Sequence, residues 1–234
     1  AGLVMSNISV ESYEPGKVSR PGHSRMRDMG HDVFRLGLHH KEDTKEQEKI
    51  RKELEKIRKA LDVIDSSVIT ENLWGERWAK LCQNCMGNPV VAMSNLGTAE
   101  LAGDEVCRKL QINLAREATE IGEKLGLDFD KFGGASKDMW LQSDDKDIYL
   151  ELDTMIKKRS NGPNRRPSMG QDIHRGRKTE ILHMSGHVLA EARALKIDLP
   201  YTKKTMETII QIDSGIIQPS VDNVYTIINS LGNV

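Results

Sequence analysis

A lysine and two asparagines stand four residues apart in the segment from Arg77 to Pro89. If this segment is a helix, Lys80, Asn84 and Asn88 lie on one face, because residues at i and i+4 stack along a helix. The intervening apolar side chains then point to other faces and can join a core. One ammonium followed by two amides can hold a small oxygen-rich molecule and give it a proton. The spacing therefore predicts a site for binding and proton transfer.

The same face has a plainer interpretation as the solvated side of an amphipathic helix. Two details favour the site. Asparagine is a poor helix former, whereas exposed helix faces usually carry long charged side chains. Pro89 removes a backbone donor and disfavours helical geometry at Asn88, so we expect the helix to end or kink there. Both interpretations stay open on this segment alone.

A second segment, residues 167–181, also carries groups suited to a small acid. Ser168 offers a hydroxyl at a predicted helix start, where backbone N–H groups attract a carboxylate. Glu180 is predicted in the first turn of the next helix, after an N-cap at Thr179. The alternatives are that both hydroxyls are plain N-caps and that Glu180 merely complements the helix dipole.

The helices and strands that must position these groups show one sequence pattern before residue 70 and another after it. Residues 1–70 alternate strand and helix patterns, with strands predicted at 2–10, 33–38 and 67–70 and a turn at Glu14-Pro15-Gly16. A helix is predicted from about 44 to 64, where one apolar stripe is spaced 4, 3, 4, 3: Ile50, Leu54, Ile57, Leu61 and Ile64.

After residue 70, helical patterns take over. Helices are predicted over 104–125, ended by Gly126, and over 147–159, followed by a loop to Pro167. Further helices are predicted over about 168–176 and 179–195, and one or two after Pro200. The stripe of the 179–195 helix is Ile181, Met184, Val188, Ala192 and Leu195. The chain is thus a small α/β unit followed by a larger all-helical domain.

The composition excludes several classes of protein. The 34 basic and 35 acidic side chains give a net charge of -1, whereas a dedicated nucleic-acid binder usually carries a basic excess. No apolar run approaches the roughly 20 residues that span a bilayer, and we expect no secretory leader. Three cysteines cannot complete a disulfide framework, so a cytoplasmic location is expected.

Metal and redox chemistry are also not expected. Cys82 and Cys85 form a lone C-x-x-C inside the predicted helix, on its apolar side, which favours packing. His174 and His183 lack carboxylate neighbours at metal-ligand spacing. No G-x-G-x-x-G follows a candidate strand, and no G-x-x-x-x-G-K-[ST] occurs in the sequence. The α/β unit therefore holds only part of a doubly wound sheet.

Together the two segments resemble the ketopantoate reductase family. Arg77-Trp78-Ala79-Lys80-Leu81, Asn84 and Asn88-Pro89 resemble the start of its C-terminal domain. About 80 residues later, its second signature is matched by Pro167-Ser168-Met169, Gln171-Asp172, Gly176-Arg177, Thr179-Glu180-Ile181 and Gly186. Glu14-Pro15-Gly16 and Phe34-Arg35-Leu36-Gly37 look like the end of its nucleotide-binding domain.

The resemblance implies a fold and domain boundaries. Residues 1–72 would be the C-terminal part of an incomplete Rossmann-type α/β domain, without its glycine-rich NADPH loop. Residues 73–234 would form an all-α domain, a helical bundle like that of 6-phosphogluconate dehydrogenase, for substrate binding and dimerisation. The implied activity is NADPH-dependent reduction of 2-dehydropantoate (ketopantoate) to pantoate, in pantothenate and coenzyme A synthesis. The partners would be a small 2-keto acid and a second copy, and we expect little or no turnover from this chain alone.

The resemblance also implies residue roles. Lys80 would be the general acid, because hydride delivery to a ketone leaves charge on oxygen. Glu180 would bind the substrate's hydroxyl, support the lysine and take part in the cofactor site. Asn84 and Asn88 would hydrogen-bond the substrate, and Ser168 its carboxylate.

Departures from the family pattern keep alternatives open. Thr98 stands where the family often has a substrate-binding asparagine, and Arg165 replaces another, with Asn164 one place away. These changes motivate a reductase for a different 2-keto acid or an imine. Another alternative is a non-catalytic dimerisation or ligand-binding module. Nucleic-acid binding through five basic residues is the most distant: Arg165, Arg166, Arg175, Arg177 and Lys178.

Overall fold

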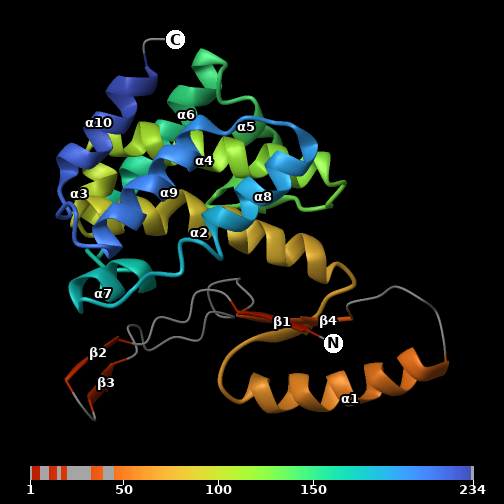
Figure 1. Ribbon diagram of the computed structural model, residues 1–234. Coiled ribbons are helices and arrows are strands. Elements are labelled where there is room, and N and C mark those ends of the chain that lie inside the picture. The colour runs from red at the N-terminus through yellow and green to blue at the C-terminus, as the bar shows by residue number, and fades with distance from the viewer. Residues whose placement is uncertain (1, 6–10, 15–16, 20–32, 39–44, 233–234) are drawn as a thin grey trace. The chain divides into compact units, whose positions relative to one another are not determined.

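The computed structural model describes residues 2–5, 11–14, 17–19, 33–38 and 45–232 of the chain, which divides into two compact units, Ala1–Lys80 and Leu81–Val234 (Figure 1). The division falls inside a single helix, α2 (Leu73–Ser94). The predicted domain boundary at 72–73 lies close to the start of this helix and stays a prediction.

The first unit contains a three-stranded sheet of order β1-β4-β5. β1 (Gly2–Met5) pairs antiparallel with β4 (Phe34–Gly37), and β4 pairs parallel with β5 (Ser67–Ile69). The crossover between the parallel strands is α1 (Lys45–Asp62), as a parallel pair requires. β2 (Glu11–Glu14) and β3 (Lys17–Ser19) form a separate antiparallel pair. This βαβ unit confirms the predicted α/β fold of the first part.

The apolar stripe of α1 covers the sheet only in part. Leu54 is 2% exposed and packs with the strand residues Val33, Phe34 and Leu36. Ile57, by contrast, is about half exposed. Of the predicted strand 2–10, residues 6–10 lie outside the described residues, as do Pro15 and Gly16 of the predicted turn.

Gly37 fixes where the sheet meets the start of α2. A Cβ added there would lie 2.8 Å from the carbonyl oxygen of Thr70 and 2.9 Å from the Cβ of Leu73. No Cβ fits at these distances from a backbone carbonyl and a Cβ, neither of which can rotate away, so only glycine allows this approach.

Of the two outcomes expected at Pro89, an end or a kink, the end does not occur, because α2 continues to Ser94. Residues 88–94 are all buried, and Val90 and Met93 have no exposed surface. Proline costs one hydrogen bond and some strain, and the burial of this last stretch offsets that cost. Tertiary packing here outweighs local helix propensity.

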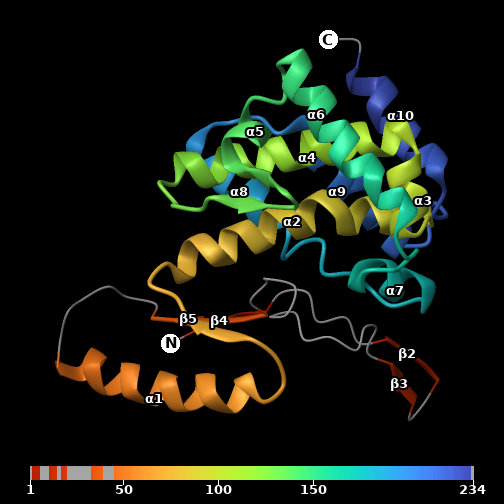
Figure 2. The same ribbon diagram turned by 180° about the vertical axis from the view of Figure 1, so that it is seen from behind.

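The second unit is a helical bundle around α4 (Figures 1 and 2). Its helices are α3 (Thr98–Gly103), α4 (Glu105–Lys124), α5 (Lys137–Leu141), α6 (Lys146–Lys157), α7 (Ser168–His174), α8 (Ser185–Leu195), α9 (Pro200–Asp213) and α10 (Val221–Leu231). A short 3-10 helix, η2 (Lys158–Asn161), follows α6. β6 (Lys131–Phe132) and β7 (Ala135–Ser136) form a small hairpin before α5. α4 contacts α3, α5, α6, α8, α9 and α10.

Local signals placed α4 correctly. Asp104 caps it by accepting from the Cys107 N–H at 2.8 Å, and Gly126 follows its end with a φ of +69°. Gly133 and Gly134, both with positive φ, form the turn that joins β6 to β7. α3, α5 and the hairpin itself are absent from our sequence-based assignment, because each is too short to show a period.

The predicted helix 179–195 is wrong in its first turns. α8 begins at Ser185, and residues 177–184 form an irregular turn. Thr179 is therefore no N-cap: its hydroxyl donates to the Asp213 carboxylate at 2.7 Å. The predicted stripe is still buried at Ile181, Met184 and Val188.

All three cysteines of the chain are buried in the helical unit. Cys82, Cys85 and Cys107 are free and buried, and burial raises the pKa of Cys85 to about 12, which confirms a packing role for the C-x-x-C. Within the described ranges, no group of three or more His, Cys, Asp or Glu side chains could hold a metal ion. No helix in that part of the chain is long and apolar enough to cross a membrane.

Candidate functional site

The polar face of α2 carries the predicted lysine. Lys80 is half-buried. Burial lowers the pKa of its ammonium below the ordinary value, and the positive charge of Arg35 lowers it further. In the part of the chain that the structure describes, no ion pair or hydrogen bond of this ammonium is recorded. A partly desolvated ammonium is a candidate for a functional site, and its role as a proton donor stays a prediction.

Asn84 and Asn88 continue the face one and two turns further on. Asn84 is half-buried and Asn88 is 9% exposed. Among the described residues, neither side-chain amide takes part in a recorded hydrogen bond. Helix geometry spaces the three residues about 6 Å apart along the axis. Asn84 is only half-buried, and neither amide is among the fully buried unpaired polar groups of the described residues, so the face fits a ligand site and a solvated helix side equally.

Ser168 and Glu180 lie close to each other. The Ser168 hydroxyl is 3.5 Å from Oε1 of Glu180, and both residues are exposed. Ser168 opens α7, which packs on the later part of α2, since a Cβ at Gly170 would lie 2.8 Å from the Val91 side chain. The chain thus brings its second polar segment next to the helix that carries Asn84 and Asn88.

Thr98 is held by the loop before α7. Its hydroxyl accepts from the Arg165 N–H at 3.0 Å and donates to the Pro163 carbonyl at 3.4 Å. The Asn164 Oδ1 accepts from the Ala99 N–H at 3.0 Å and so caps α3. Thr98 and Asn164 therefore join two loops, and the substrate contact suggested for Thr98 stays a prediction.

Lys80 belongs to the first unit and the other predicted residues to the second. Within the second unit, the structure brings Ser168 and Glu180 together and places Asn84 and Asn88 on one face. The convergence of Lys80 with Glu180 on one substrate stays a prediction.

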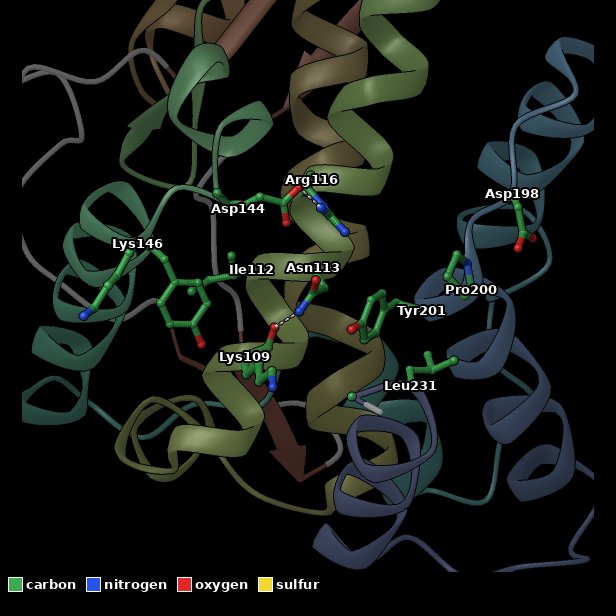
Figure 3. A pocket seen from close by; sticks show the side chains of 13 residues that line it. Lys109, Ile112, Asn113, Arg116, Asp144, Lys146, Asp198, Pro200, Tyr201 and Leu231 are labelled. Carbon is green, nitrogen blue, oxygen red and sulfur yellow. Dashed lines mark hydrogen bonds and ion pairs between the residues drawn. The ribbon is translucent and has the colours of Figure 1, made fainter. Parts of the chain in front are cut away.

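A hollow of about 700 Å³ opens elsewhere in the second unit, between α4, α6 and the ends of α9 and α10 (Figure 3). Arg116 and Asp144 pair across it, and Lys109 and Tyr201 line it. None of the predicted site residues lines this hollow. It is therefore separate from the candidate site.

One protein-family model matches the part of the chain that holds all the predicted site residues. A family model described as "Ketopantoate reductase PanE/ApbA C terminal" matches residues 72–213. The chain belongs to this family. The match runs from the first residues of α2 to the last residue of α9, and it includes both polar segments.

Two relatives of this ketopantoate reductase family member share about a quarter of its residues over the aligned part. A 2-dehydropantoate 2-reductase of Pyrococcus horikoshii is 25% identical over 132 residues, which are 56% of this chain and 38% of that protein. One of Mesorhizobium japonicum is 29% identical over 113 residues, 48% of this chain and 29% of that protein. The chain thus aligns with less than half the length of these relatives.

Solved structures share the fold. A 2-dehydropantoate 2-reductase from Geobacter metallireducens has a TM-score of 0.65 at 22% identity, over 90% of this chain and 60% of that one. A D-mandelate dehydrogenase with NADH and anilino(oxo)acetate has a TM-score of 0.65 at 17% identity, over 90% and 59%. A dimeric ketopantoate reductase from Staphylococcus aureus has a TM-score of 0.62 at 16% identity, over 91% and 61%.

Sequence reasoning missed the residues that hold the second segment in place. Asn164 acts on α3, 65 residues away, and Asp213 binds Thr179 across 34 residues. No local pattern links such pairs. One signal was available: Asp213 ends a helix with no basic residue in its last turn, where the dipole disfavours a carboxylate.

Gly97→Ala tests the hydrogen bond by which Asn164 caps α3 in this family member. A Cβ at Gly97 would lie 2.0 Å from Oδ1 of Asn164, so Asn164 must give up its cap on α3. We expect a loss of about 1 kcal/mol in the free energy of unfolding, the usual value of a cap. Urea unfolding followed by circular dichroism measures it. On an Asn164→Ala background, Gly97→Ala should change the free energy of unfolding little. A full additional loss there would contradict the capping role of Asn164.

Proposed function

We propose that the whole protein reduces 2-dehydropantoate to pantoate with NADPH, and that this chain supplies its substrate-binding helical part. The observation that carries the proposal is the Lys80 ammonium, which is partly desolvated, has no ion pair or hydrogen bond with the described residues and lies within the family match. The two relatives described above, both named 2-dehydropantoate 2-reductase, support the substrate.

The proposed roles follow from the chemistry of each group. NADPH, when bound, would supply the hydride for the ketone carbon, and the chain's own residues would then have to stabilise the negative charge on the carbonyl oxygen. Lys80 polarises that oxygen and gives it a proton, and its lowered pKa makes the ammonium a stronger acid. Asn84 and Asn88 donate amide hydrogen bonds to the substrate. Ser168 binds its carboxylate, and Glu180 binds its hydroxyl and takes part in the cofactor site.

Substrate binding is measurable on the 234-residue chain by calorimetric titration with 2-dehydropantoate. We expect binding by the unaltered chain and, for Asn88→Ala, an affinity about tenfold lower, since a buried hydrogen bond is worth about 1–2 kcal/mol. Asn113→Ala is the control, because Asn113 is a helical asparagine that is half-buried and lies on the hollow instead.

The outcome of this titration decides the substrate. Absence of binding by the unaltered chain, or an equal loss in both variants, would reject the proposed site. Steady oxidation of NADPH by these 234 residues alone would contradict a purely substrate-binding role.

The proposal also includes NADPH rather than NADH as the cofactor, a homodimer and a cytoplasmic location. The dimeric Staphylococcus aureus structure supports the homodimer.

A second candidate is the reduction of a different 2-keto acid. Thr98 and Asn164 are both engaged by backbone groups of neighbouring loops, so they offer fewer free groups than the family's two asparagines. A smaller or less polar acid needs fewer contacts. A panel of 2-keto acids assayed with the whole protein distinguishes the two: 2-dehydropantoate gives the highest kcat/KM under the first proposal and not under the second.

A further inference from the structure

Glu180 stands on irregular backbone and needs an external support. It lies in the turn between α7 and α8, and its side chain is exposed. Its carbonyl accepts from the N–H groups of His183, at 2.9 Å, and Met184, at 3.2 Å. No regular helix fixes the direction of the carboxylate. A substrate ligand on such a turn must be held by contacts from elsewhere.

The neighbouring residue supplies such a contact. The backbone N–H of Thr179 lies 3.3 and 3.2 Å from the two carboxylate oxygens of Asp213. The Thr179 hydroxyl donates to the same carboxylate at 2.7 Å. Hydrogen bonds to a charged acceptor are stronger than neutral ones. Asp213 therefore ties the turn to the end of α9.

The position of Asp213 is unfavourable without this contact. It is the last residue of α9, where the helix carbonyls already carry partial negative charge, and no basic residue is present in the last turn. The donors of Thr179 compensate for that placement. The carboxylate thus stands at a helix end that disfavours it and binds the residue that precedes Glu180.

We propose that Asp213, acting through Thr179, is a positioning residue for Glu180 in substrate binding. The substrate part of this inference rests on the proposed function. Asp213 touches no substrate itself. It holds the turn so that the Glu180 carboxylate stays beside the Ser168 hydroxyl, 3.5 Å away, where a hydroxy or keto acid is bound.

Two substitutions of Thr179 distinguish the effect of its hydroxyl donor from the effect of its side-chain size. Thr179→Val keeps the shape and removes the hydroxyl donor, whereas Thr179→Ser keeps the donor. By titration of the 234-residue chain with 2-dehydropantoate, we expect about tenfold weaker binding for Thr179→Val, the order expected of one charged hydrogen bond. Thr179→Ser should stay near the unaltered affinity. Thr208→Val on α9 is the control, because its hydroxyl bonds only within the helix.

A double substitution shows whether the effect passes through Glu180. On a Glu180→Gln background, Thr179→Val should cause no further loss of affinity. An equal loss on both backgrounds, or full affinity in Thr179→Val, would overturn the positioning role. Asp213→Asn gives the same comparison from the other partner, should Thr179→Val fold poorly.

Hydrogen exchange provides a readout that needs no ligand. The amide protons of His183 and Met184, which bond to the Glu180 carbonyl, should exchange faster in Thr179→Val and not in Thr208→Val. Unchanged exchange would overturn the inference. If the unaltered chain does not bind 2-dehydropantoate, the proposed function fails, and exchange alone then decides whether Asp213 holds the turn.

Discussion

Lys80→Ala should lower kcat/KM of the whole protein for 2-dehydropantoate by a factor of about 10² or more, the usual contribution of a general acid. The loss should lie mainly in kcat, because the proton is needed only as charge develops on the substrate oxygen. Steady-state NADPH oxidation at 340 nm measures it. Lys80→Met should fold at least as well as the unaltered protein, since it removes a partly desolvated charge.

The pH profile gives an independent check on the same residue. A general acid acts in its protonated form, so the rate should fall as pH rises through the Lys80 pKa. Burial lowers that pKa below the ordinary value of 10.5, so the alkaline limb should appear below it. Arginine does not deprotonate in this range, so Lys80→Arg should lose that limb from its residual rate. A non-catalytic module predicts instead that Lys80→Ala leaves every measured activity intact.

Arg108→Ala should produce the largest loss of stability in the helical unit. Arg108 is 4% exposed, and its guanidinium binds Asp153 through Nε at 2.6 Å and Nη2 at 3.2 Å. Its Nη1 donates to the carbonyls of Ala102 and Gly103 at the end of α3. One side chain thus joins α3, α4 and α6. Removing it leaves a carboxylate and two carbonyls without their partner, which costs about 3–5 kcal/mol.

Thermal unfolding followed by circular dichroism measures this loss, and the midpoint should fall by on the order of 10 °C. Arg116→Ala is the matched control on the same helix. Its partner Asp144 has a side chain 78% exposed, and such surface pairs are worth about 1 kcal/mol or less. Equal midpoints for the two variants would show that the Arg108 contacts do not carry the packing of α3 and α6.

The sequence by itself determined the elements with long periods and strong end signals. The stripe from Ile50 predicted α1, and Gly126 predicted the end of α4, because capping and periodicity act within a turn or two of the chain. The spacing of Lys80, Asn84 and Asn88 placed three polar groups on one helix face for the same reason.

The tertiary structure decided what depends on residues far apart in the chain. α2 continues past Pro89 because its last turns are buried, and the helix expected from Thr179 begins only at Ser185, while the Thr179 hydroxyl donates to Asp213 of α9. Asn164 caps α3 across 65 residues. Local preferences amount to about 1 kcal/mol per residue, and packing and charged hydrogen bonds of similar or larger size override them. Only the folded chain shows which of these contacts form.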